Sequence, residues 1–301
     1  MEATYTTTAA EVLDGIDLAG RRAVITGATA GLGLETARAL VHAGADIVLV
    51  GRDAEKLARS ASFVAGDAAG QVTSSRMDLG DLVDTGEAAA KLATETDRVD
   101  LLVLNAGVMA APLERTAQGH EGQLAVALLG HHLLTTALLE HLTASQGRVV
   151  TLSSVAHRMA PFDFGDPDFT TREYDRWVAY AQSKTATALY ALELARRFGP
   201  AGVVGTAVHP GVIKTELQRH LAPAEEEHVL AQSAERGELR PVEVGAASIV
   251  WAAVAPEVAA ANGCYVANGA VANELRAPHA SGAEDATRLW DWAEAAVAGF
   301  R

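Results

Sequence analysis

The sequence has one cysteine and no long hydrophobic run, and each absence excludes a class of protein. Cys264 alone cannot form a disulfide within the chain, which suits a reducing compartment. A membrane-spanning helix needs about 20 apolar residues in succession, and every apolar run here is interrupted well before that length. The first residues lack the basic segment and apolar core of a signal peptide. We therefore expect a cytoplasmic protein without membrane insertion.

Basic residues are also scarce. Lys and Arg number 24 against 38 Asp and Glu, which gives a formal net charge of −14. A field of this sign repels nucleic-acid backbones, so no nucleic acid is expected as a partner. It does not exclude a small phosphate ligand, because a local nest of backbone N–H groups can bind one. The ten histidines show no ligand spacing with cysteines or acids, so no metal site is predicted.

Short apolar strands alternate with helical segments along the chain. The predicted strands cover residues 23–26, 46–50, 72–77, 101–104, 149–152 and 203–208, and the predicted helices 34–42, 81–96, 119–142, 174–198 and 242–254. Continuous apolar strands separated by helices are typical of a parallel sheet covered on both faces. Right-handed crossovers then predict a doubly wound, Rossmann-type α/β fold that binds ligands at the carboxyl ends of its strands.

No Pro-, Gly- or Ser-rich linker interrupts this alternation before the C-terminus. We predict a polar leader over residues 1–17 and a single domain over residues 18–301. Two polar segments, 158–172 and 217–240, fall outside the pattern, and the region around 213–240 is a candidate lid.

A glycine-rich stretch follows the first strand and reads Thr26-Gly27-Ala28-Thr29-Ala30-Gly31-Leu32-Gly33. Glycines there let the backbone turn tightly and approach a pyrophosphate at the helix N-terminus, although an ordinary glycine-rich turn is the alternative. Arg52 follows the second strand, where an arginine accommodates the 2′-phosphate of NADP and an acid would hold the ribose of NAD. The alternative is a solvated arginine paired with Asp53 or Glu55.

Tyr180 and Lys184 are four residues apart on a predicted helix and so share a face. A nearby positive charge is expected to lower the tyrosine pKa from about 10, which would suit a proton donor and acceptor. Taken alone, most such pairs are surface residues.

Ser153 and Ser154 end a predicted strand, at the edge where this fold binds its ligand, although serines there are commonly turn formers.

Together these motifs resemble the short-chain dehydrogenase/reductase family from about Leu18 to Trp290. The resemblance rests on the order TGxxxGLG, Asn105-Ala106-Gly107, Ser154, YxxxK and His209-Pro210-Gly211-Val212-Ile213-Lys214-Thr215. A closer likeness is to the retinol-dehydrogenase-like and WW-domain-oxidoreductase-like branch, through LGHHLLT at 129–135, SSVAH at 153–157 and ELARR at 193–197.

The resemblance implies an oxidoreductase that uses NADP(H) in preference to NAD(H) on a ketone, aldehyde or secondary alcohol. Ser154 would polarise the substrate oxygen, with Ser153 in reserve. Tyr180 would exchange the proton, and Lys184 would bind the nicotinamide ribose and tune the phenol. The other implied cofactor residues are Gly27, Thr29, Gly31, Leu32 and Gly33 at the pyrophosphate, Asp78 and Leu79 at the adenine, Asn105, Ala106 and Gly107 along the cofactor, and Pro210, Gly211, Val212 and Thr215 at the nicotinamide end. By analogy, we expect a lipophilic substrate and a homodimer or homotetramer.

One position departs from the branch, whose helix before the serine strand usually reads N-x-L-G-H. Here Ala127 stands where the asparagine would supply an amide to a water-linked proton relay. The relay must then run through backbone and water, or be impaired. A non-catalytic NADP(H)-binding scaffold therefore stays open, although a scaffold would not need Ser154, Tyr180 and Lys184. A redox-neutral lyase or dehalogenase is a further alternative, disfavoured by the glycine-rich turn and Lys184.

Overall fold

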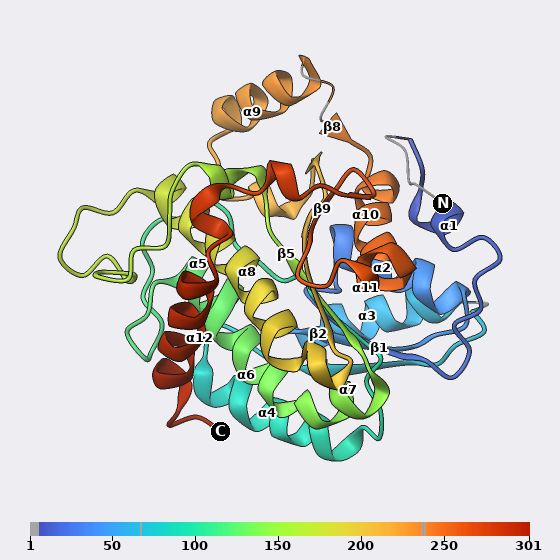
Figure 1. Ribbon diagram of the computed structural model, residues 1–301. Coiled ribbons are helices and arrows are strands. Elements are labelled where there is room, and N and C mark those ends of the chain that lie inside the picture. Colours follow the sequence, from blue (N-terminus) through green and yellow to red (C-terminus); the bar gives the residue numbers. More distant parts are fainter. Residues whose placement is uncertain (1–5, 67, 236, 238) are drawn as a thin grey trace.

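The computed structural model describes residues 6–66, 68–235, 237 and 239–301, which form a central sheet of eight strands (Figure 1). The strands are β1 (Arg22–Thr26), β2 (Asp46–Gly51), β3 (Val72–Arg76), β4 (Leu101–Leu104), β5 (Arg148–Leu152), β6 (Val204–His209), β9 (Tyr265–Ala267) and β10 (Ala270–Val271). Their order is β10-β9-β6-β5-β4-β1-β2-β3, with all neighbours parallel apart from β9 and β10. The predicted doubly wound fold is confirmed.

The winding of the chain reverses between β1 and β4, which are hydrogen-bonded neighbours. Crossovers run outward from these two strands in opposite directions, so their carboxyl ends border a crevice where such folds bind ligands. The glycine-rich turn follows β1 and Asn105 follows β4. Two of the predicted cofactor motifs therefore meet at this crevice.

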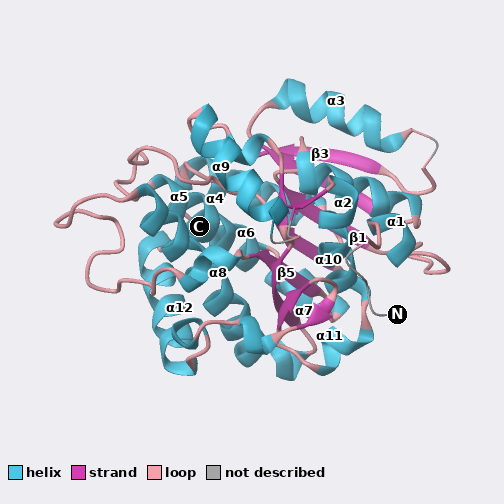
Figure 2. Cartoon of the chain, turned by 90° about the horizontal axis from the view of Figure 1, so that it is seen from above, coloured by secondary structure: helices cyan, strands magenta, loops and turns pink. Residues whose placement is uncertain are grey.

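Helices cover both faces of the sheet, which Figure 2 shows lying between them. One layer contains α1 (Ala9–Val12), α2 (Gly31–His42), α3 (Ala54–Ala65), α10 (Val242–Val254) and α11 (Pro256–Ala260). The other contains α4 (Leu82–Glu95), α5 (Gly122–Leu124), α6 (Gly130–Ala137), α7 (Leu139–Ser145), α8 (Arg176–Phe198) and α12 (Ala283–Val297). Each layer has its own hydrophobic core against the sheet.

Helix α8 carries the predicted catalytic pair. Asp175 caps its first turn by accepting hydrogen bonds from the backbone N–H groups of Trp177 (2.8 Å) and Val178 (3.0 Å). The helix packs against β5 and β6 on one side and against α12 on another. This two-sided packing buries most of the helix between Ala179 and Leu194, polar side chains included, and holds Tyr180 and Lys184 in place.

The predicted helix 119–142 is divided in the structure. A π-helical turn, Ala125–Leu129, separates α5 from α6, and the axis bends by 63° between α6 and α7. Gly130 begins α6, where a Cβ atom would lie 2.4 Å from the Leu79 carbonyl oxygen. Only glycine permits this approach of the helix to the end of β3. Within the described ranges no single helix could span a membrane, although α5–α6 with α7 would qualify as a bent pair by length and composition alone.

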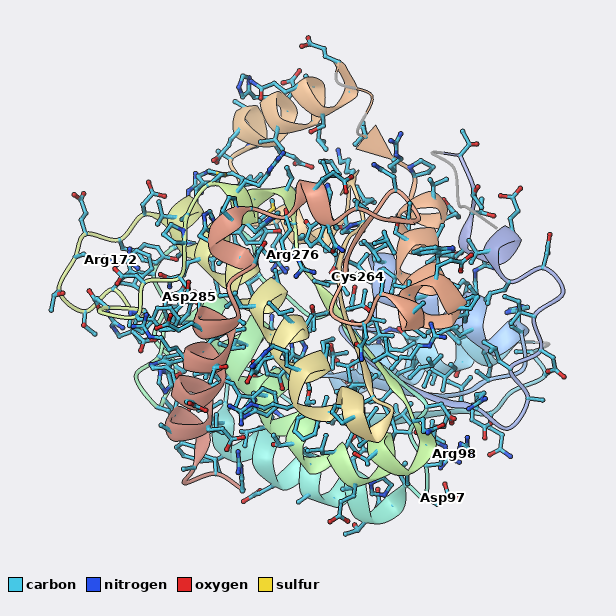
Figure 3. All side chains as sticks on the ribbon, viewed as in Figure 1. Asp97, Arg98, Arg172, Cys264, Arg276 and Asp285 are labelled. Atoms are coloured by element: carbon cyan, nitrogen blue, oxygen red, sulfur yellow. The ribbon has the colours of Figure 1, made fainter. Side chains whose placement is uncertain are left out.

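The first polar segment, 158–172, is an irregular loop that Figure 1 shows protruding from the body. Asp166 organises it by accepting hydrogen bonds from the backbone and hydroxyl groups of Thr170 and Thr171. Arg172, labelled on this loop in Figure 3, donates to Gln182 of α8 (2.8 Å). The loop is thereby tied to the catalytic helix.

The candidate lid region, 213–240, has secondary structure of its own. Strand β7 (Val212–Ile213) pairs with β8 (Leu239–Arg240), and between them lie a 3₁₀ turn (Glu216–Gln218) and α9 (Pro223–Glu235). In Figure 1, α9 and β8 stand at the top of the molecule, apart from the two main layers. Residues 236 and 238 of this region lie outside the described residues, as do residues 1–5 of the predicted leader. The described part of the leader contains α1, which packs on α10.

Candidate active site

The glycine-rich turn and the end of β4 are in close contact. A Cβ atom on Gly27 would lie 2.9 Å from the Cα of Ala106, and one on Gly33 would lie 2.5 Å from the Asn105 side chain. The Asn105 amide donates hydrogen bonds to the carbonyls of Thr26 (2.8 Å) and Gly27 (3.3 Å). Because larger residues could not fit, the glycines allow β1 and β4 to fix the shape of the turn.

Helix α2 begins at this turn with free backbone N–H groups. Ala30 precedes it and has no side-chain oxygen that could cap it. Uncapped N–H groups at a helix N-terminus attract a phosphate, both by hydrogen bonding and through the helix dipole. A Cβ atom on Gly31 would lie 3.2 Å from the methyl group of Thr215, so the segment after β7 covers the same turn. The residues therefore fit a pyrophosphate.

The other predicted cofactor residues surround this turn. Thr29 contacts the end of β2, where a Cβ atom on Gly51 would lie 3.3 Å from its methyl group. Leu32 points toward α10, so it could contact a ligand mainly through its backbone. Asp78 and Leu79 follow β3, and Pro210 and Gly211 link β6 to β7 at Val212. All of them follow the carboxyl ends of strands or begin a helix there.

Tyr180 and Lys184 are buried side by side on α8. The Lys184 Nζ lies 5.6 Å from the centre of the Tyr180 ring and donates a hydrogen bond to the Leu152 carbonyl (2.8 Å). A Cβ atom on Gly107 would lie 3.6 Å from the same Nζ. Lys184 therefore joins the predicted catalytic groups to the Asn-Ala-Gly motif.

The two serines after β5 have different surroundings. Ser153 is buried, and its hydroxyl donates to the Lys184 carbonyl (2.9 Å). Ser154 is half-buried, caps a short 3₁₀ turn (Val155–Arg158) and hydrogen-bonds with Tyr180. Ser154 is thus the serine that the structure brings to the phenol, whereas Ser153 supports the backbone of α8.

The expected pKa direction for Tyr180 is wrong in this arrangement. Burial raises the pKa of the phenol to about 12, and the hydrogen bond with Ser154 lowers it only in part. Burial also lowers the pKa of Lys184 from its usual 10.5 to about 8. Desolvation, a tertiary effect, therefore outweighs the attraction between phenolate and ammonium that helical spacing suggested. At neutral pH Tyr180 holds its proton and can donate it.

Arg52 lies at the end of β2, where it is exposed. Asp53 caps α3 by accepting from the Lys56 backbone (2.9 Å), and Glu55 faces Arg59 (3.7 Å). Neither acid pairs with Arg52, and no other carboxylate within the described ranges does so. Arg52 is thus solvated without an ion pair to either neighbouring acid, and the guanidinium is available to an anion.

An apolar cluster surrounds Tyr180, and sequence patterns had not identified it. Its buried members are Met109, Ala110, Ala156, Tyr180 and Leu221, with Trp177 and Leu217 packed against them. Trp177 precedes Tyr180 by three residues on α8, a helical spacing that could have suggested it. The two leucines come from the lid region, and no local pattern connects them with the site.

Ala127 lies in the π-helical turn, where backbone carbonyls lose their α-helical partners. Its carbonyl accepts a hydrogen bond from the His131 Nδ1 (3.1 Å), so the His131 Nε2 must accept from the Thr26 hydroxyl (2.8 Å). Burial, with a smaller effect from the charge of Lys184, lowers the pKa of His131 to about 4. A neutral histidine therefore connects this turn to β1.

Comparisons with known proteins agree with this geometry. A family model described as short chain dehydrogenase matches residues 21–226. Retinol dehydrogenase 13 of Homo sapiens is 38% identical over 281 residues, covering 90% of this chain and 82% of that protein. A Streptomyces antibioticus protein named "Probable oxidoreductase" is 39% identical over 297 residues, covering 92% of this chain and 97% of that protein.

Two solved structures extend the comparison. An uncharacterised protein from Mycobacterium paratuberculosis has a TM-score of 0.76 at 31% identity, covering 99% of this chain and 98% of that chain. The Pseudomonas aeruginosa RhlG/NADP active-site complex has a TM-score of 0.67 at 25% identity, covering 83% and 95%. The second contains a nicotinamide cofactor according to its description.

Proposed function

This chain belongs to the short-chain dehydrogenase family and is an NAD(P)-dependent oxidoreductase of alcohol or carbonyl groups, and we propose that it reduces lipophilic ketones or aldehydes with NADPH. The observation that carries the proposal is the grouping of Tyr180, which hydrogen-bonds with Ser154, beside the buried Lys184, and reduction is favoured because NADP(H) is the expected cofactor. A phenol that keeps its proton at neutral pH is an acid ready to protonate a substrate oxygen.

Each residue has a role that its surroundings support. Nicotinamide, when bound, supplies the hydride. Ser154 orients the substrate oxygen by hydrogen bonding, and Tyr180 protonates it. Lys184, held against the Leu152 carbonyl beside Gly107, would bind the nicotinamide ribose. The turn before α2 would hold the pyrophosphate.

The preference for NADP(H) and for lipophilic substrates rests on two features. Arg52 is exposed and its neighbouring acids are otherwise engaged, so a 2′-phosphate would be its counter-ion. The cluster of Met109, Ala156, Trp177 and Leu221 around Tyr180 offers an apolar surface to the substrate. A cytoplasmic location and a homodimer or homotetramer stay predictions.

The test is NADPH consumption with ketones and aldehydes graded by apolar size, with NADH as the comparison cofactor. We expect turnover with NADPH and a preference for the larger apolar carbonyls. Tyr180→Phe removes only the hydroxyl, so NADPH binding should survive while turnover falls by about 10²-fold or more. Tyr190→Phe is the matched control, because Tyr190 is on the same helix but bonds His132.

The scaffold alternative rests on Ala127, and the same assay separates it from catalysis. A wild-type protein that binds NADPH and reduces none of the carbonyls would favour the scaffold. Undiminished turnover in Tyr180→Phe would show that another group donates the proton.

A further inference from the structure

We infer that Arg219, from the lid region, is a second ligand for the 2′-phosphate of NADP(H), opposite Arg52. This inference rests on the proposed cofactor and names a specificity residue that follows from none of the sequence motifs. Arg52 approaches the phosphate from the sheet, and Arg219 would approach it from the segment that also lines the substrate site.

The chain from Thr215 to Arg219 lies across the entrance to the cofactor crevice. Thr215 covers the first residue of α2, and the Lys56 Nζ of α3 lies 3.9 Å from the Glu216 carboxylate. Thr29, Lys56 and Glu216 also line one surface hollow of about 320 Å³. Arg52 lies just before α3, and Lys56 of α3 contacts Glu216. The segment 215–219 is therefore near Arg52, where a 2′-phosphate is expected.

The guanidinium groups of Arg52 and Arg219 leave an excess of positive charge beside the cofactor crevice. The Arg219 guanidinium donates to the Glu216 carbonyl (3.0 Å), and among the residues the structure describes it has no carboxylate partner. Burial and then the charge of Arg52 lower the pKa of Arg219, while the charge of Glu216 raises it by a smaller amount, and Arg52 also contributes to lowering the pKa of His220. Arg52 and Arg219 are close enough for their charges to interact, and neither has a carboxylate in direct contact within the described chain, so an anion between them would be attracted by both.

Lys56 is the other cation nearby, and it has a partner already. Its ammonium lies 3.9 Å from the Glu216 carboxylate, so this one acid is shared between Lys56 and Arg219. A phosphate monoester carries about 1.5–2 negative charges at pH 7, enough to engage two arginines. The 2′-hydroxyl of NAD(H) carries none, so Arg219 should affect only the phosphorylated cofactor.

The segment that carries Arg219 continues into the substrate site. The His220 carbonyl accepts a hydrogen bond from Arg176 (3.3 Å), and Leu221 belongs to the cluster around Tyr180. Glu225 then accepts from Arg176 (2.6 Å) and from the Trp177 indole (3.0 Å). A phosphate held by Arg219 would therefore anchor the lid region from the cofactor side.

The experiment is a titration of the full-length protein with NADPH and with NADH, followed by cofactor fluorescence. Arg219→Gln should raise the Kd for NADPH about tenfold or more, in line with loss of a charge-assisted contact, and leave the Kd for NADH unchanged. Arg219→Lys should retain most of the affinity. Lys214→Gln is the control, because Lys214 is on the same segment but pairs with Glu226 (3.5 Å).

Arg52→Gln, measured in parallel, separates this inference from the proposed cofactor. If Arg52→Gln weakens NADPH while Arg219→Gln does not, the inference is wrong and the cofactor preference stands. Equal weakening of NADPH and NADH by Arg219→Gln would also overturn it, since that indicates a structural role. If the wild type binds both cofactors equally and neither variant matters, both proposals fail.

Discussion

A buried cation at the centre of the site has a cost for folding. Lys184 is almost fully buried, and its pKa is about 8 instead of 10.5. The unfolded chain therefore holds this proton more tightly than the folded protein does. The resulting destabilisation is fully present below about pH 8 and disappears as the pH rises toward 10.5.

Lys184→Met should consequently stabilise the protein while it removes activity. We expect the free energy of unfolding at pH 7 to rise by about 1–3 kcal/mol, reduced by the hydrogen bond that Leu152 loses. Thermal unfolding without cofactor at pH 7 and at pH 10 measures the effect, and the gain should shrink at pH 10. Lys56→Met, at an exposed site, is the control. A variant less stable than wild type at pH 7 would contradict the prediction.

Cofactor choice is also decided by single residues. Arg52→Ala together with Gly51→Asp should reverse the preference from NADPH to NADH, because a carboxylate at the end of β2 can hold a ribose hydroxyl. A Cβ atom at position 51 would lie 3.3 Å from Thr29 and 3.4 Å from Leu57, both side-chain contacts that can adjust slightly. The ratio of the two Kd values measures the outcome. Equal affinities in the unmutated protein would remove the basis for the prediction.

For single residues, sequence spacing predicted which side chains are neighbours on a helix, but it did not predict the tertiary surroundings that set their pKa values. Tyr180 and Lys184 could be paired from sequence because four residues make one helical turn. The direction of the Tyr180 pKa could not be predicted, because it depends on burial by Ala156 and Leu221, which come from separate segments. Ser153 and Ser154 are neighbours in sequence but bond to different partners, the Lys184 carbonyl and the Tyr180 hydroxyl.

Among the elements, the strand rhythm predicted the sheet but not the interruption of the long helix. The π-helical turn precedes Gly130, whose close approach to Leu79 is a tertiary contact that the sequence pattern does not show. The lid region has few apolar residues and gave no pattern. Its fold depends on pairing of β7 with β8 and on contacts with Arg176 and Trp177.

The π-helical turn leads to a prediction for Ala127. The Ala127 carbonyl accepts a hydrogen bond from the His131 ring, and a carbonyl in a locally opened helix can also hold a water. A bridging water is nearly as favourable enthalpically as a direct hydrogen bond, so the proton relay need not fail without an asparagine. Ala127→Asn should therefore change the turnover number by less than about tenfold, or 1.4 kcal/mol of barrier.

Steady-state kinetics of Ala127→Asn on any accepted ketone decides this, with thermal unfolding to establish that the buried amide is accommodated. A turnover number two orders of magnitude higher in Ala127→Asn would mean that the proton relay of the wild type is impaired. A wild type that binds NADPH but reduces nothing, alongside such a gain, would favour the scaffold interpretation.

For the whole molecule, several histidines are held neutral between packed layers. Burial lowers the pKa of His131, His132 and His209 from 6.5 to about 4. Between these values the unfolded chain binds more protons than the folded protein, so stability falls as the pH drops from about 6.5 toward 4. Each histidine should contribute about 1–3 kcal/mol to this loss at pH 4.

His132 is the member that joins α6 to the C-terminal helix. Its Nε2–H donates to Glu294 of α12 (3.0 Å), its Nδ1 accepts from the Tyr190 hydroxyl (3.1 Å), and its ring contacts Trp290 edge-on at 4.8 Å. His132→Phe removes the titrating group but keeps an aromatic ring. We expect it to lower stability at pH 7 by about 1 kcal/mol through the lost hydrogen bonds.

The same variant should nonetheless be less sensitive to acid. Its Tm should fall less steeply than that of the wild type between pH 6.5 and pH 4, because one buried group no longer has to stay unprotonated for the protein to fold. Thermal unfolding across this range measures both slopes, and His228→Gln, at an exposed site on α9, is the matched control. Parallel slopes for wild type and His132→Phe would mean that acid destabilises the protein elsewhere, through carboxylates or through His131 and His209. A shallower slope for His132→Phe alone would assign a defined part of the acid sensitivity to the docking of α12.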